Sequence, residues 1–218
     1  RVINTNQQFI AQEIYDIGLQ LHKSVTIGDD KSGLVNAIKE LRLDADVLII
    51  TGGLGPTDDD RTTEALAETL LLPLIRDEES EAEIKSYFES KNRPFYKSNL
   101  KQADFPKGAM IISNTIGTAP GYILEKGGCI HVVLPGVPRE MKLMFNNVVL
   151  PLLLNKMPPN ATYRKKVQFR LIGCGESEAA DALKRLYPLP ESLNIGYRAK
   201  MPEIHVTLTV SHSVQEMV

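Results

Sequence analysis

The run TGGLGPTDDD at residues 51–60 brings anion-binding and cation-binding residue types together. It follows the apolar run VLII at 47–50, which predicts a buried strand, and it precedes a helical pattern at 61–71. Its glycines would let a strand-to-helix turn point backbone N–H groups at one spot, which suits a phosphate. Its three carboxylates would repel that phosphate unless a cation lay between them. The segment therefore predicts a metal-assisted site for a phosphorylated ligand.

Ordinary structural roles explain only part of this run. Glycine turns between strands and helices are common, and an Asp at a helix start is a good cap. Three successive carboxylates are more than capping requires. The run is not a Walker A loop, because no Gly-Lys-Ser/Thr follows it, and it lacks the Gly-x-Gly-x-x-Gly spacing of a dinucleotide-binding fingerprint. A ligand site is the favoured interpretation.

Asp29 offers a second carboxylate in the segment Gly28-Asp29-Asp30. Sequence alone favours a turn with a capping Asp. Open α/β sheets, however, bind ligands beyond the carboxyl ends of their strands. A short strand ending near Ile27 would bring Asp29 to the same rim as the acidic run, where it could serve metal binding or general-base chemistry.

Two later loops could reach the same rim. The segment NTIGTAPG at 114–121 follows an expected strand at 110–113, and its glycines and Thr118 could contact ligand phosphates, although a plain β-turn is equally open. The segment PGVPRE at 135–140 also follows a strand and opens a helix, so its backbone amides could face a ligand. Arg139 and Glu140 could simply pair on the surface, where a pair is worth little.

The elements around these segments alternate between helix and strand, which predicts an α/β domain with a largely parallel sheet. Apolar residues at helical spacing predict helices at 10–21, 34–41 and 78–91. Strands at 121–125 and 130–134 flank KGGC and predict a hairpin. Pro138 suits the first turn of a helix, and Pro151 predicts a kink or break within it.

A second, smaller domain follows the linker-like segment NKMPPN at 155–160. It begins with a strand at 165–172 and a helix at 176–186, and two more strands at 193–199 and 203–210 complete a β-α-β-β unit. We therefore predict domains at 1–156 and 161–218. The first is expected to lack an N-terminal strand, and the second to be truncated.

Composition limits the function classes. With 218 residues, 43% hydrophobic and 24% charged, and a net charge of −2, the chain is typical of a globular protein and has no basic excess for nucleic acid or anionic membranes. No apolar stretch approaches the roughly 20 residues that span a bilayer, and no signal peptide is visible. Cys129 and Cys174 lack metal-type spacing and are expected to be reduced, which favours a cytoplasmic location. The scattered histidines argue against a histidine metal site, and the absence of a Gly-x-Ser-x-Gly elbow argues against a serine hydrolase.

Taken together, the motifs resemble the CinA (competence/damage-inducible protein A) family over nearly the whole chain. The matching segments are Asn4-Thr5-Asn6, Gly28-Asp29, residues 51–57 with Asp59-Asp60, Thr62 and Glu64-Ala65, Gln102-Ala103 with Pro106, Asn114 with residues 117–121, residues 134–138 with Glu140-Met141, and Gly175-Glu176-Ser177. The family's early Gly-(Thr/Asn)-Glu-Leu-Leu loop, which contributes a Glu near the site, would precede Arg1. Asp58 stands at a variable position of the family pattern, which favours Asp59 and Asp60 over Asp58.

The resemblance implies a three-layer α/β/α fold with a mostly parallel sheet, similar to the molybdopterin-binding domains of MogA and MoaB, followed by a small KH-like α+β domain. It implies hydrolysis of nucleotide pyrophosphates such as ADP-ribose, or FAD, with a divalent cation, Mg²⁺ or Co²⁺, and K⁺ in addition. It also implies a homodimer that binds a nucleotide or dinucleotide as a small molecule. Neither nucleic acid nor a membrane is an expected partner. The alternatives are a molybdopterin or nucleotide binding module without turnover, a mainly structural dimerising platform, or the non-deamidase part of a nicotinamide-nucleotide amidase, since nothing matches the deamidase domain.

The residues assigned to this site come from the motifs and the resemblance together. Asp29 and Asp60 are the expected catalytic carboxylates, and Asp59 and Asp60 the expected metal ligands. The expected ligand-binding residues are Asn4, Asn6, Thr51, Gly52, Gly53, Gly55, Pro56, Thr57, Asn114, Gly117, Thr118, Gly121, Pro135 and Gly136.

Overall fold

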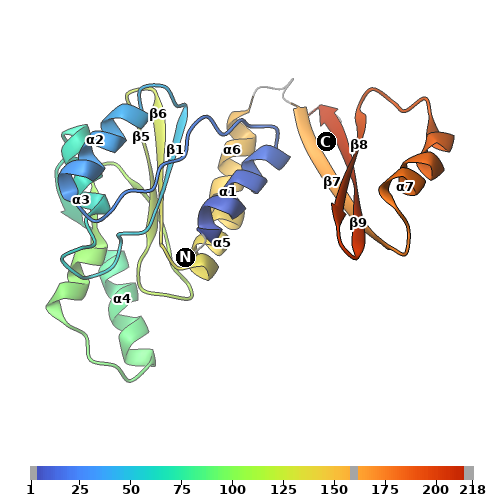
Figure 1. Ribbon diagram of the computed structural model, residues 1–218. Helices are drawn as coiled ribbons and strands as arrows, with labels where there is room; N and C mark the ends of the chain where they lie inside the picture. The colour runs from blue at the N-terminus through green and yellow to red at the C-terminus, as the bar shows by residue number, and fades with distance from the viewer. Residues whose placement is uncertain (1–3, 158–161, 214–218) are drawn as a thin grey trace. The chain divides into compact units, whose positions relative to one another are not determined.

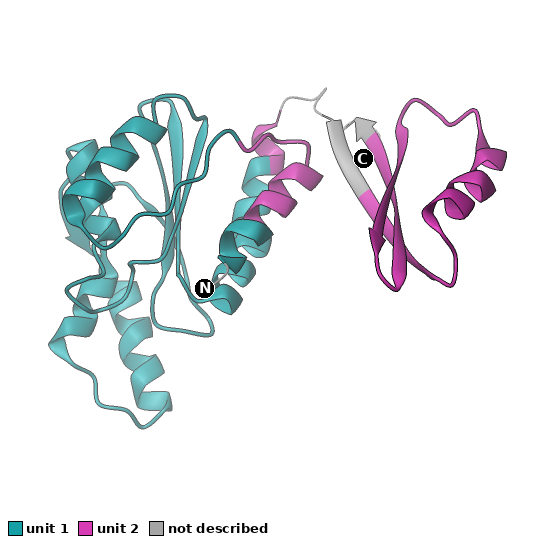
Figure 2. Cartoon of the chain, in the orientation of Figure 1, with its two compact units in different colours: residues 1–9, 22–153 teal, residues 10–21, 154–218 magenta. Residues whose placement is uncertain are grey.

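The computed structural model describes residues 4–157 and 162–213. Their contacts divide the chain into two compact units (Figure 2). The first unit comprises residues 1–9 and 22–153, and the second comprises residues 10–21 and 154–218. The candidate site lies in the first unit. None of the described helices combines the length and apolar character that a bilayer crossing requires.

The sheet of the first unit has four strands in the order β1 (Val47–Thr51), β6 (Cys129–Leu134), β5 (Gly121–Lys126) and β4 (Met110–Ile112). Among these described strands, β1 and β6 form the one parallel pair, and β5 is antiparallel to both of its neighbours. The sheet is therefore mixed, and the expectation of a mostly parallel sheet is wrong. The cause is the hairpin that the sequence did predict, whose turn places Gly127 and Gly128 at φ +64° and +78°.

The mixed order still brings three strand ends to one edge. Because β5 reverses direction, β1, β6 and β4 all run the same way, and their carboxyl ends meet where β5 begins. The register confirms this, since Thr51 lies opposite Leu134 and Ile112 lies opposite Gly121. The loops at 52–61, 113–120 and 135–137 thus leave the sheet at one rim, as expected.

Helices cover both faces of this sheet (Figure 1). Helices α2 (Lys31–Leu41) and α3 (Thr62–Leu70) lie on one face, and α5 (Pro138–Met144) lies on the other with the start of α1 (Thr5–Asp16). Side chains alternate between the two layers, as a strand period of two requires. Those packed in the α2–α3 layer include Leu48, Tyr122, Leu124, Cys129 and Val133. The three-layer α/β/α architecture is confirmed.

The helix after β6 contains the irregularity expected at Pro151. A π turn, η2 (Phe145–Val149), separates α5 from α6 (Leu150–Lys156). Proline has no N–H to donate, and its ring clashes with the carbonyl four residues earlier in a regular α-helix. The wider π turn lies just before Pro151, so the chain continues as a helix instead of breaking.

Two features of the first unit were not expected. A small antiparallel pair joins β2 (Leu74–Arg76) to β3 (Asp104–Pro106), and a 3-10 helix, η1 (Lys97–Ala103), precedes β3. Between them lies the predicted helix α4 (Glu78–Ser90), with Ile84 buried.

The strand expected near Ile27 is absent, since residues 19–28 form no regular secondary structure. No described strand pairs with this segment.

The second unit contains a three-stranded antiparallel sheet in the order β7 (Thr162–Ile172), β9 (Glu203–Ser213) and β8 (Leu193–Lys200). Helix α7 (Glu176–Leu183) and the 3-10 turn η3 (Lys184–Leu186) follow β7. Ala179, Ile204 and Val206 form its small core. The predicted β-α-β-β order is confirmed, while the exact domain limits stay a prediction.

Candidate functional site

The loop after β1 has a backbone that only glycine adopts readily. Gly52 and Gly53 have φ angles of +94° and +68°. The Gly52 N–H extends the β1–β6 ladder by donating to the Leu134 carbonyl at 2.9 Å. The buried Thr62 hydroxyl donates to the Gly52 carbonyl at 2.8 Å. A Cβ at Gly53 would lie 2.2 Å from Thr62 Oγ1, so no other residue fits there without moving α3.

The same loop presents three consecutive free donors. The backbone N–H groups of Gly53, Leu54 and Gly55 have no acceptor among the described residues. They lie between the end of β1 and the start of α3, where the helix dipole also favours a negative charge. Consecutive N–H groups beside a left-handed backbone form a concave anion site. The loop can therefore receive a phosphate oxygen.

The three aspartates that follow differ in orientation and exposure. The Asp60 carboxylate turns back into its own loop, where Oδ2 accepts from Thr57 Oγ1 at 2.6 Å and from the Thr57 N–H at 3.1 Å. It occupies the space that Gly55 leaves open, since a Cβ at Gly55 would lie 2.3 Å from Asp60 Oδ2. Asp58 and Asp59 are exposed. Polar groups of the same loop, first the Thr57 side chain and then a backbone N–H, lower the pKa of Asp59, which favours its ionised form.

This donor set suits a hard divalent cation held partly by a ligand. Carboxylate oxygens are preferred by Mg²⁺, which commonly binds one or two protein carboxylates and takes its other ligands from phosphate and water. The described residues contain no group of three or more His, Cys, Asp or Glu side chains placed to hold a metal. Asp59 and Asp60 could thus supply part of a coordination sphere, and a bound phosphate would have to supply more.

Asn114 organises the loop between β4 and β5. Its Oδ1 accepts from the Gly117 N–H at 2.8 Å, and its Nδ2 donates to Glu140 Oε2 at 2.7 Å and to the Ala119 carbonyl. Glu140 lies where Gly117 lacks a side chain, because a Cβ there would be 2.5 Å from the carboxylate. Glu140 therefore has a partner in the neighbouring loop, beyond the surface pair with Arg139 that the sequence left open. Consecutive helix residues point in different directions, and Glu140 faces Asn114.

The loop after β6 touches the glycine loop directly. A Cβ at Gly136 would lie 3.3 Å from the Gly52 Cα. The Gly136 carbonyl accepts from Asn6 Nδ2 at 2.8 Å, which ties the start of α1 to this rim. Asn6 is buried, and its Oδ1 has no partner among the described residues. Asn4, in contrast, is exposed and caps its own helix by accepting from the Gln7 N–H at 3.0 Å.

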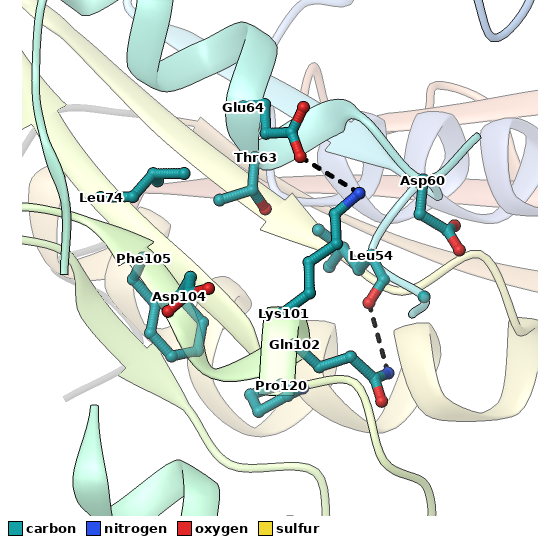
Figure 3. Close-up of a pocket in the computed structure, with 12 residues that line it drawn as sticks. Leu54, Asp60, Thr63, Glu64, Leu74, Lys101, Gln102, Asp104, Phe105 and Pro120 are labelled. Carbon is teal, nitrogen blue, oxygen red and sulfur yellow. Dashed lines mark hydrogen bonds and ion pairs between the residues drawn. The ribbon is translucent and has the colours of Figure 1, made fainter. Parts of the chain in front are cut away.

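A small pocket of about 50 Å³ opens beside the glycine loop (Figure 3). Its lining consists of Gly53, Leu54, Gly55, Asp60, Thr63, Glu64, Leu74, Lys101, Gln102, Asp104, Phe105 and Pro120. Lys101 Nζ donates to the Thr57 carbonyl at 3.2 Å and pairs with Glu64 at 3.2 Å. At this volume the pocket holds a small polar group or a few water molecules and does not enclose a nucleotide.

The structure brings most of the expected residues to the rim. Gly52, Gly53, Gly55, Thr57, Asp59 and Asp60 share one loop, and Asn6, Asn114, Gly117, Thr118 and Gly136 come from the neighbouring ones. Thr51, Pro56, Gly121 and Pro135 lie within or next to them. Gly121 has a packing role, since a Cβ there would lie 2.8 Å from the Val133 carbonyl.

Asp29 lies in the segment that leads into α2. It is exposed in the bend before α2 and is not part of the pocket lining. Its neighbour Asp30 caps α2, with Oδ2 accepting from the Gly33 N–H at 2.7 Å. The capping Asp that the sequence favoured is therefore Asp30, and the role of Asp29 stays a prediction.

Sequence reasoning did not assign Lys101, Gln102, Thr63 or Glu64 to the site. Gln102 and Glu64 belong to motifs of the family pattern, which was the one signal that could have pointed to them. Lys101 and Thr63 carried no such signal, because their place in the pocket depends on η1 and α3 meeting in space.

Comparison with known proteins agrees with this architecture. Residues 1–155 match the family model of the "Probable molybdopterin binding domain". A "Putative competence-damage inducible protein" of Natranaerobius thermophilus is 41% identical over 185 residues, covering 85% of this chain and 45% of the relative. Another with the same description, from Caldicellulosiruptor bescii, is 40% identical over 217 residues, covering 100% of this chain and 52% of the relative. The chain spans about half the length of these relatives.

A solved structure shares the fold of most of the chain. The protein CinA "with unknown function" from Thermoplasma acidophilum superposes with a TM-score of 0.64 at 32% sequence identity. The match covers 70% of this chain and 89% of that one.

Proposed function

Since the chain belongs to the family of the probable molybdopterin binding domain, and within it to the CinA-like proteins, we propose that its rim binds the phosphates of a nucleotide-like ligand and hydrolyses their pyrophosphate bond. ADP-ribose is the proposed substrate, and FAD a related one. A homodimer in the cytoplasm is also part of the proposal, as the resemblance implies.

One observation supports this function above the others. Three unpaired N–H groups at Gly53, Leu54 and Gly55 lie in the same loop as the exposed carboxylate of Asp59, whose pKa is lowered. An anion cradle next to a fixed negative charge is unfavourable for binding phosphate alone. It becomes favourable when a divalent cation is shared between the carboxylate and the phosphate.

Asp59 and Asp60 would hold that cation. When bound, Mg²⁺ or Co²⁺ would supply charge neutralisation on the phosphates and a Lewis acid for the attacking water. Thr57 orients Asp60 through two hydrogen bonds, and the glycine loop binds phosphate oxygens through backbone amides. Lys101 holds the same loop through the Thr57 carbonyl. Asp29 as a general base remains part of the proposal, although it lies outside the pocket lining.

Binding without turnover is the second candidate, and specific contacts favour it. The Asp60 carboxylate is already engaged by Thr57, and no cluster of three potential metal ligands exists among the described side chains. A site of this kind could retain a molybdopterin or a nucleotide without cleaving it, because the same fold supports different functions.

The decisive experiment measures hydrolysis of ADP-ribose and FAD by the chain with Co²⁺ or Mg²⁺, each with and without K⁺. We expect metal-dependent cleavage that Asp59→Asn and Asp60→Asn each reduce by about 100-fold or more. Asp58→Asn is the matched control. Asp58 is exposed and contributes its backbone carbonyl to Arg61 at 2.7 Å, which Asn retains, so activity should stay within about twofold.

Two outcomes would decide against the hydrolase. Equal activity of Asp60→Asn and the unsubstituted chain would remove the carboxylate from the reaction. Tight binding of a pterin or nucleotide with no cleavage under any metal condition would establish the binding module instead.

A further inference from the structure

Gln102 connects two loops of the rim from a buried position. It comes from η1, it is 6% exposed, and its Nε2 donates to the Leu54 carbonyl at 3.3 Å and to Thr118 Oγ1 at 3.2 Å. The orientation of the amide follows from chemistry, because a backbone carbonyl can only accept and the NH₂ group must therefore face it. One side chain thus spans the glycine loop, through the contact with Leu54 drawn in Figure 3, and the loop at 114–120, through Thr118.

Burying the Gln102 amide at this position lowers the stability of the fold. Its Oε1 is buried and has no partner among the described residues. An unpaired buried acceptor opposes folding, and an apolar side chain of the same volume, such as Met, would avoid that penalty. Filling space does not account for Gln102, and its two hydrogen bonds hold the two loops in a fixed geometry.

Each loop that Gln102 joins carries a hydrogen-bond donor that a ligand could use. Leu54 lies in the middle of the three free N–H groups of the glycine loop. Thr118 Oγ1 accepts from Gln102, so its own O–H remains to donate elsewhere. The η1 helix is also anchored to the glycine loop through the contact of Lys101 with the Thr57 carbonyl. The spacing between the two donor groups is thus set by η1.

We propose that Gln102 is a positioning residue that holds the glycine-loop amides and the Thr118 hydroxyl as two adjacent anion subsites, one for each phosphate of a pyrophosphate. The inference rests on the proposed function and names its ligand class as compounds with two linked phosphates, in preference to monophosphates. One phosphate lies on the amides of Gly53–Gly55, and the other receives the hydrogen bond of Thr118.

The test compares binding of methylenediphosphonate, which cannot be hydrolysed, with binding of inorganic phosphate, by calorimetry with the same saturating Mg²⁺ in the cell and the syringe. The unsubstituted chain should bind the diphosphonate about tenfold or more tightly than phosphate, the value of an added hydrogen bond to a charged group. Gln102→Met keeps the volume and removes the bridge. It should reduce this preference to less than about threefold while phosphate affinity changes by less than about threefold.

Controls separate positioning from simple loss of stability. Gln12→Met removes an exposed glutamine that bonds only to Asp16 among its described contacts, and it should leave the preference intact. Thr118→Val should lose the preference and Thr118→Ser should retain it, which also tests the proposal if Gln102→Met does not fold. A merely structural Gln102 would weaken both anions equally, and that result overturns the inference.

The outcomes also distinguish this inference from the proposed function. A retained diphosphonate preference without any hydrolysis would leave the two subsites standing and remove the turnover. Hydrolysis by a chain that binds both anions equally would support the proposed function and overturn the two subsites. A chain with no affinity for either anion would overturn both.

Discussion

Replacing Gly53 with Ala should lower the free energy of unfolding for two separate reasons. The first is backbone strain, because Gly53 has φ +68° and a left-handed backbone costs an L-residue about 1–2 kcal/mol. The second is contact, because the new Cβ would lie 2.2 Å from Thr62 Oγ1. Moving that hydroxyl breaks its bond to the Gly52 carbonyl at 2.8 Å and leaves the buried Thr62 without this partner, at about 1–3 kcal/mol.

A second glycine of the same unit isolates the contact. Gly128 has φ +78°, and a Cβ there meets nothing within 4 Å. Gly128→Ala therefore carries the strain without the clash, and both substitutions restrict the unfolded chain equally. We expect Gly53→Ala to lower the free energy of unfolding by about 2–5 kcal/mol and Gly128→Ala by about 1–2 kcal/mol.

Urea unfolding with a common m-value measures both costs. The excess for Gly53→Ala should nearly vanish in a Thr62→Ala background, since the double-mutant cycle removes the oxygen that the new methyl group meets. If Gly53→Ala and Gly128→Ala cost the same, or if Thr62→Ala leaves the excess unchanged, the contact with α3 is not what requires glycine at this position.

Two further predictions concern other parts of the first unit. Burial lowers the pKa of His131, so below about pH 6.5 the unfolded chain binds a proton that the folded chain does not. The free energy of unfolding should therefore fall as the pH drops through this range, and His131→Gln should flatten that slope in urea titrations. Gly117→Ala should displace Glu140 from Asn114 and cost about 0.5–1.5 kcal/mol by thermal or urea unfolding. An unchanged cost in a Glu140→Ala background would contradict that explanation.

Much of the fold is encoded in short stretches of sequence. Apolar spacing predicted α2, α4 and β1 because each pattern is read within one element. Three glycines between strand and helix predicted the turn at 52–55, and glycine is the residue type that permits the left-handed backbone found at Gly52 and Gly53. The KGGC hairpin was also correct, and its consequence, an antiparallel β5 in an otherwise co-directional sheet, was missed.

The errors fall where an element depends on a distant partner. The segment before Gly28 has β-forming residues, yet no described strand pairs with it, and Asp30 uses its carboxylate to cap α2. Asp29 is therefore separated from the pocket lining. The sequence left open a surface pair of Glu140 with Arg139 and gave no sign that packing places Glu140 over Gly117.

The sequence by itself determined which residue types could bind a phosphate and a cation, and that they follow a buried strand. These properties are local, since turn chemistry and periodicity involve only residues a few positions apart. The tertiary structure alone decided that Asp60 turns inward to Thr57 while Asp59 remains exposed, and that Gln102 reaches a loop 48 residues earlier in the chain. Such contacts depend on how the sheet order and packing bring distant segments together, and no local pattern records that arrangement.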